Sequence, residues 1–245
     1  MKIVKWILAG VSTLMVIGAI GLAVWGLDAY QPTKAALDAL QSDDHVNVVM
    51  HDGYITFEPL GQQPVTGFVF VPGGRVDYRA YTPVLHQIAA QGFFVAIVKV
   101  HINLAFFDIN APDRVIPLYP DIQHWVIGGH SLGGVAAARY AEKHLDALEG
   151  IVFWASYPPD SALASSDLKV LSIYGTNDMA GVKAFETSRT LLPGDAQFVT
   201  IPGGNHAQFG AYGVQAGDNV ATITAEDQWA QTVKATANFL ANMNQ

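Results

Sequence analysis

The sequence has no cysteine and few basic residues. Without cysteine there can be no disulfide, no thiol nucleophile, no acylated lipoprotein cysteine and no metal site with thiolate ligands. Lysine and arginine number only 13 against 21 acidic residues, and no basic patch stands out, so the composition does not favour nucleic-acid binding. Charged residues make up only 14% and hydrophobic residues 51%, which argues against disorder and provides for a sizeable core.

The N-terminus carries a long uncharged stretch. Two lysines precede residues 6–27, which contain no charged side chain and form a helix of roughly 33 Å, enough to cross a bilayer core. The apolar region of a cleaved signal peptide is usually shorter, and no small-x-small cleavage site follows this one. Trp6 and Trp25 stand where interfacial anchors are expected. We expect residues 1–27 to be a membrane anchor, with a cleaved signal sequence and a secreted protein as the alternative.

Charges on either side of this stretch predict its orientation. The lysines lie before it and acidic residues follow it, which places the N-terminus in the cytoplasm and the rest of the chain outside the cytoplasmic membrane. Residues 28–45 are polar and read as a linker with a short helix over 34–40. Residues 46–245 form the expected folded domain.

Apolar runs and turn signals alternate through this domain. A hairpin of strands at 45–50 and 54–58 is expected first, because Asp52 and Gly53 form a tight-turn signal. Further strands are expected at 66–71, 93–98, around Trp125, and at 150–155, 170–174 and 197–201. Helices are expected at 82–90, 112–118, 132–144, 181–191 and 225–243. Strands that alternate with helices and are continuously apolar predict an α/β fold, with a mostly parallel central sheet and helices on both faces.

One pentapeptide stands between an expected strand and an expected helix. Residues 129–133 read Gly-His-Ser-Leu-Gly, and small residues follow them. In this context a sharp strand-to-helix turn exposes the serine oxygen, and the glycines avoid clashes that a larger residue would make. Ser131 would lie at a helix N-terminus, where backbone N–H groups can stabilise an oxyanion. The pattern predicts a nucleophilic serine.

A serine nucleophile needs a histidine base. In folds of this pattern the chain order is serine, acid, histidine, and only His144 and His206 follow Ser131. His144 ends the helix after the serine, several turns away from it. His206 follows the last expected strand, at the edge where a parallel sheet keeps its active site. We therefore expect His206 to be the base.

The base in turn needs an orienting acid. Asp178 follows the strand at 170–174 and precedes a helix, which also makes it a candidate helix cap. Asp160, after the preceding strand, is the alternative acid. We favour Asp178.

An oxyanion hole needs two backbone donors. One should be the N–H of Leu132, the residue after the nucleophile. The other should come from the glycine-rich turn at 72–75, after the strand at 66–71. We assign it to Gly74, with Arg75 as the alternative.

With these motifs the chain resembles the α/β-hydrolase family, and in particular its small, lid-poor esterase and dienelactone-hydrolase-like branch, over about residues 46–243. The resemblance implies Ser131 as nucleophile, His206 as base and Asp178 as acid. Pro72 departs from the histidine that many members carry there, which leaves the second oxyanion donor between Gly74 and Arg75. True dienelactone hydrolases use a cysteine nucleophile, so their substrate is not transferred to this chain.

The expected reaction is hydrolysis of small or medium carboxylic esters through an acyl-enzyme, which needs no metal and no cofactor. A thioesterase, amidase or peptidase on the same triad is the first alternative. A hydrolase-fold protein that binds a ligand without turnover is the second. Six aromatic residues are candidates for the pocket walls: Phe106, Phe107, Trp154, Tyr157, Phe209 and Tyr212.

Overall fold

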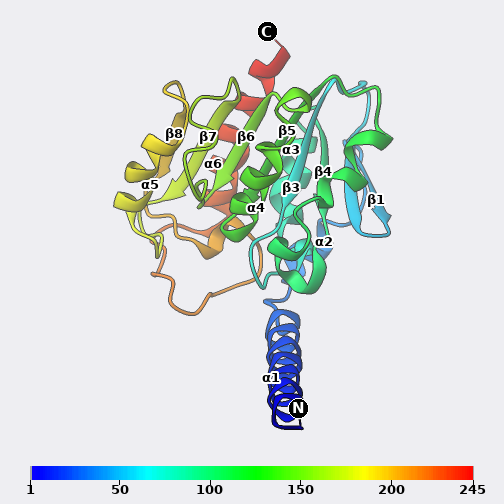
Figure 1. Cartoon of the computed structure of the whole chain (residues 1–245). Coiled ribbons are helices and arrows are strands. Elements are labelled where there is room, and N and C mark those ends of the chain that lie inside the picture. The colour runs from blue at the N-terminus through cyan, green and yellow to red at the C-terminus, as the bar shows by residue number, and fades with distance from the viewer. Residues whose placement is uncertain (1, 245) are drawn as a thin grey trace.

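The computed structural model describes residues 2–244 and shows one sheet with strand order β1-β2-β4-β3-β5-β6-β7-β8 (Figure 1). The strands are β1 (Val46–His51), β2 (Tyr54–Pro59), β3 (Thr66–Val71), β4 (Phe94–Val98), β5 (His124–His130), β6 (Gly150–Trp154), β7 (Lys169–Gly175) and β8 (Gln197–Ile201). β3 to β8 run parallel, while β2 is antiparallel to both β1 and β4. The parallel strands therefore end at one common edge.

Helices cover both faces of the sheet, as expected for buried parallel strands. The helices are α1 (Lys2–Leu27), α2 (Lys34–Asp38), α3 (Thr82–Ala89), α4 (Leu132–Ala141), α5 (Val182–Ser188) and α6 (Ala225–Ala241). On one face α3 and α6 pack together over a core that includes Phe70 and Trp154. On the other face α4 lies on β5 and β6 over Ile127 and Phe153. The mostly parallel α/β sheet predicted from the sequence is confirmed.

The expected elements and the observed ones differ mainly where the sequence lacks a clear period. The strands expected at 66–71 and 197–201 have the observed bounds. The helix expected at 112–118 is instead a pair of short 3₁₀ helices, Ala111–Arg114 and Ile116–Leu118. Each contains a proline near its start, which removes a backbone donor and favours short turns over a continuous α-helix.

Helix α1 projects from the domain, at the bottom of the view in Figure 1. Its stretch Gly10–Leu27 is long and apolar enough for a membrane span, and equally for a signal sequence. The segment 28–45 that follows is packed on the domain: the Tyr30 N–H donates to the carbonyl of Arg75 at 2.7 Å, and Ala36 is fully buried.

Candidate active site

Ser131 occupies a strained turn between β5 and α4. Its φ of 51° and ψ of −121° lie in a region that non-glycine residues seldom adopt. Gly129 and Gly133 make the turn sterically possible, because a Cβ at either position would meet the backbone of Gly133 or of Pro72. Neighbouring strands hold the turn: the Ser131 N–H donates to the Trp154 carbonyl at 3.0 Å, and the Ser156 hydroxyl donates to the Ser131 carbonyl at 2.7 Å. The half-buried serine side chain thus stands at the carboxyl edge of the sheet.

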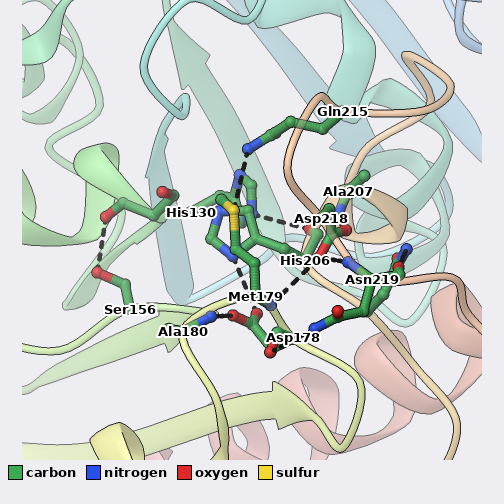
Figure 2. Close-up of polar contacts among 12 residues, drawn as sticks. His130, Ser156, Asp178, Met179, Ala180, His206, Ala207, Gln215, Asp218 and Asn219 are labelled. Atoms are coloured by element: carbon green, nitrogen blue, oxygen red, sulfur yellow. Dashed lines mark hydrogen bonds and ion pairs between the residues drawn. The ribbon is translucent and has the colours of Figure 1, made fainter.

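The structure brings Asp178 and His206 together from the loops after β7 and β8 (Figure 2). Nδ1 of His206 lies 2.9 Å from Oδ2 of Asp178, and Oδ1 of Asp178 accepts the Ala180 N–H at 2.8 Å. Both side chains are almost fully buried. A carboxylate can only accept, so Nδ1 carries the proton and Nε2 keeps its lone pair. Nε2 is buried, and within residues 2–244 neither it nor the Ser131 hydroxyl makes a hydrogen bond.

The glycine turn after β3 lies against the start of α4. A Cβ on Gly74 would come within 2.8 Å of the Leu132 side chain, so the two backbones are neighbours. The Arg75 N–H is already used, because it donates to the carbonyl of Asn103 at 2.8 Å. In the described part of the chain the N–H groups of Gly74 and Leu132 have no acceptor. These are two open donors beside Ser131, and Gly74 rather than Arg75 is the one available from the glycine turn.

A buried chain of hydrogen bonds joins this turn to the serine turn and to the His206 loop. The Gly73 N–H donates to the Tyr81 hydroxyl at 3.0 Å, and that hydroxyl lies 2.9 Å from Nδ1 of His130. Nε2 of His130 lies 3.1 Å from the carbonyl oxygen of His206. The carbonyl can only accept, so Nε2 carries the proton and Tyr81 donates to Nδ1. Burial, and then the nearby His206, lower the pKa of His130 well below its usual value, which keeps the ring neutral.

Asp218 links the loop that carries Asp178 to the segment that carries His206. Its Oδ2 accepts the Ala207 N–H at 2.8 Å, and its Oδ1 accepts the Met179 N–H at 3.2 Å (Figure 2). Ala207 follows the histidine directly, and Met179 follows the aspartate. No sequence motif marks Asp218, because it lies in an irregular loop. His130 stands inside the serine motif, but its position there gives no sign of its partners.

Other candidates lie apart from this cluster. Asp160 pairs with Arg139 at 2.8 Å, and His144 stacks on Tyr140 with its Nδ1 on the Tyr140 carbonyl. Among the aromatic residues expected to wall a pocket, Trp154 and Phe209 are fully buried in the core, because both stack within the apolar cluster under α6.

A cavity of about 420 Å³ is lined by Ala207, Asp218 and Trp229 among others, but not by Ser131 or His206. Within residues 2–244 the structure brings together no group of three histidine or acidic side chains that could hold a metal ion.

A comparison with protein families identifies the class of protein. Residues 67–230 match the model of the alpha/beta hydrolase family, so the chain belongs to that family. The resemblance drawn from the motifs is confirmed. A search of curated protein sequences finds no match.

Several solved structures share the fold at low sequence identity. Est1E from Butyrivibrio proteoclasticus is 13% identical with a TM-score of 0.57, and the match covers 82% of this chain and 99% of that one. The thermophilic esterase Est2 from Thermogutta terrifontis is 12% identical with a TM-score of 0.59, covering 86% and 94%. A putative dienelactone hydrolase from Klebsiella pneumoniae is 16% identical with a TM-score of 0.52, covering 75% and 92%. At these identities the likeness shows a shared fold.

Proposed function

We propose that the protein is a serine hydrolase that cleaves carboxylic esters, with Ser131 as nucleophile, His206 as base and Asp178 as orienting acid. The observation that carries the proposal is the buried His206–Asp178 pair, whose proton arrangement leaves Nε2 of the histidine as a free base. The strained turn at Ser131 supports it. The solved structure of Est2 from Thermogutta terrifontis, which shares this fold, is described as an esterase, which agrees with an ester substrate.

The proposed reaction transfers an acyl group to water. The Ser131 oxygen attacks the ester carbonyl while Nε2 of His206 takes the hydroxyl proton, and the N–H groups of Gly74 and Leu132 donate to the oxyanion. The bond between the carbonyl carbon and the alcohol oxygen then breaks, the imidazolium protonates that oxygen, and the alcohol leaves while the acyl group stays on Ser131 as an ester. In the second half His206 takes a proton from water, the water oxygen attacks the acyl-Ser131 ester, and the imidazolium returns the proton to the Ser131 oxygen as the carboxylic acid departs. Ser131 and His206 must close to hydrogen-bond distance for the first step, as such pairs do when substrate binds.

A fluorophosphonate probe tests the nucleophile without knowledge of the natural ester. We expect the wild-type protein to be labelled on Ser131 and to hydrolyse p-nitrophenyl esters, and the Ser131→Ala variant to lose labelling and at least about 10³-fold of the rate. Ser165→Ala, at an exposed serine, is the matched control and should behave as wild type. An unlabelled Ser131, with equal rates for wild type and Ser131→Ala, would reject the enzyme in favour of a binding protein. A series of ester, thioester and amide substrates then separates an esterase from the alternative hydrolases.

We further propose that α1 is retained as a membrane span, with the N-terminus in the cytoplasm and the hydrolase domain outside. The two lysines before the apolar stretch and the acids after it support this orientation. Hydrogen bonds from the domain to the end of α1 support its retention, because cleavage of a signal sequence would remove their acceptors: the Arg75 Nε–H donates to the Trp25 carbonyl at 2.9 Å.

A further inference from the structure

The end of α1 is fastened beside the glycine turn of the candidate active site. The Arg75 guanidinium lies over the Trp25 ring, 4.7 Å from its centre, and Arg75 follows Gly74 directly. Asn103 makes a second link, because its carbonyl accepts the Arg75 N–H while its side-chain amide donates to the Gly26 carbonyl at 3.1 Å. Ile102, the residue before Asn103, has a positive φ of 46°, which a β-branched residue seldom adopts.

Almost no chain separates α1 from the domain. The apolar stretch ends at Leu27, and Tyr30 already makes backbone hydrogen bonds to both Arg75 and Asp77. Even a fully extended chain of three residues spans only about 10 Å. A bilayer crossed by α1 would therefore lie next to the edge of the domain that carries the glycine turn, which is the carboxyl edge of the parallel strands.

Exposed apolar side chains stand along the same edge. They follow the carboxyl ends of four parallel strands, β4, β6, β7 and β8, and loops of this edge lie on the side of the domain from which α1 projects (Figure 1). Phe107 is 56% exposed and Val214 is 91% exposed. We define the apolar rim as Phe106, Phe107, Tyr157, Met179, Val214 and Val220.

We propose that the apolar rim rests in the interface of the bilayer that α1 crosses, so that the candidate active site opens toward the lipid and takes lipophilic esters from it. An exposed apolar surface signals an interaction site, and bulky apolar side chains enter the boundary between headgroups and acyl chains. Trp25 marks the depth of that boundary, since tryptophan is enriched at membrane interfaces. The substrate part of the proposal rests on the proposed hydrolase function, whereas the docking part rests only on α1 and the rim.

Because the sequence has no cysteine, a single introduced cysteine can be labelled specifically, which permits a direct test of the docking surface. A nitroxide label is attached to Phe107→Cys or Val214→Cys in the full chain, reconstituted in vesicles of phosphatidylcholine and phosphatidylglycerol. Leu118→Cys and Leu145→Cys are matched controls, because both side chains are exposed and precede β5 and β6 at the opposite edge. We expect rim labels to collide mainly with lipid-soluble oxygen and control labels mainly with a water-soluble nickel complex. Equal accessibility of rim and control labels to the nickel complex would overturn the proposal.

A kinetic comparison tests the substrate class. Val214→Asp and Val220→Asp should lower hydrolysis of p-nitrophenyl palmitate in the same vesicles about tenfold, which corresponds to about 1.4 kcal/mol of lost binding free energy. Hydrolysis of water-soluble p-nitrophenyl acetate should not change, and Leu118→Asp should change neither rate. Equal losses on both esters, or no loss on the palmitate, would overturn the role of the rim in substrate capture. If the wild type cleaves neither ester, the hydrolase proposal fails, and the labelling experiment still decides the docking surface.

Discussion

A single buried hydroxyl joins two loops of the candidate active site. Tyr81 accepts from the Gly73 N–H and donates to His130, so Tyr81→Phe leaves two polar groups unpaired in the interior. Each such group costs about 1–3 kcal/mol, and we expect the free energy of unfolding, measured in urea, to fall by at least that amount. We also expect a lower kcat on p-nitrophenyl acetate. Tyr78→Phe is the matched control, because in residues 2–244 the Tyr78 hydroxyl has no hydrogen bond. Equal stability of the two variants would contradict the assigned network.

The neutral ring of His130 predicts a pH dependence of stability. Burial lowers the pKa of His130 in the folded protein, while in the unfolded chain histidine has its ordinary pKa of about 6.5. Below that pH the unfolded state binds more protons than the folded state, so stability falls as the pH falls, by up to about 1.4 kcal/mol per pH unit from this group. Urea unfolding between about pH 7 and pH 5 should therefore show a shallower slope for His130→Gln than for wild type. His45→Gln, at an exposed histidine, should follow wild type, and parallel curves for all three proteins would refute the expectation.

At the residue scale the sequence predicts groups that carry a motif and misses those that only support them. Ser131 stands in a recognisable glycine pattern, and His206 is an eligible histidine after it. Tyr81 is 49 residues from its partner His130, and no local pattern links the two. Such a contact depends on how α3 and the preceding turn pack on the sheet.

The later part of the loop after β8, around Asp218, acts as a strap: it joins the loop that carries Asp178 to the earlier part of its own loop, which carries His206. Asp218 accepts one N–H group from each of these two segments, so Asp218→Ala leaves both N–H groups without their acceptor. We expect kcat on p-nitrophenyl acetate to fall about 10-fold to 100-fold, since small misplacements of catalytic groups have effects of this size. Stability in urea should change by no more than about 1–2 kcal/mol, because the loop is partly exposed. Asp195→Ala, at an exposed aspartate, is the control, and a kcat equal to wild type in Asp218→Ala would show that the loops hold their geometry without the strap.

The bounds of regular elements are predicted well where a run of residues stands between clear turn signals. β3 has the expected bounds and is buried along its whole length, between the turn signals on either side. β8 also has the expected bounds, although only Ile201 at its end is buried. The region 99–123 is harder, because its apolar residues follow no helical or strand period, and it forms short 3₁₀ helices. Helix α4 ends at Ala141, a few residues before the expected end at His144.

For the whole molecule, retention of α1 makes a measurable difference in mass and partitioning. We expect the protein from membranes to have the full mass of 26.3 kDa, and to stay in the membrane fraction through an alkaline carbonate wash. A peripheral protein held only by charge would be released by that wash. A product that lacks residues 1–27 and appears in the soluble fraction would establish the signal-sequence alternative.

The family and the mostly parallel sheet could be predicted from the sequence, but the placement of the segment before the sheet could not. Residues 28–45 are polar in composition, yet Tyr30 pairs with the glycine turn and the Thr33 N–H donates to the Ala211 carbonyl at 2.8 Å. Backbone hydrogen bonds of this kind leave no trace in composition. The contacts that hold the end of α1 beside Gly74 could not be predicted from the sequence for the same reason.

Gly73 and Gly74 are consecutive residues, yet their backbone amides differ in burial and in hydrogen bonding. The Gly73 amide is locked by Tyr81 in the interior, whereas the Gly74 amide is open at a half-buried position. Hydrogen exchange at Gly73 therefore requires an opening that separates its N–H from the buried Tyr81 hydroxyl, while exchange at Gly74 requires only local solvent access. Of these two neighbouring amides, only that of Gly74 is therefore available to a ligand.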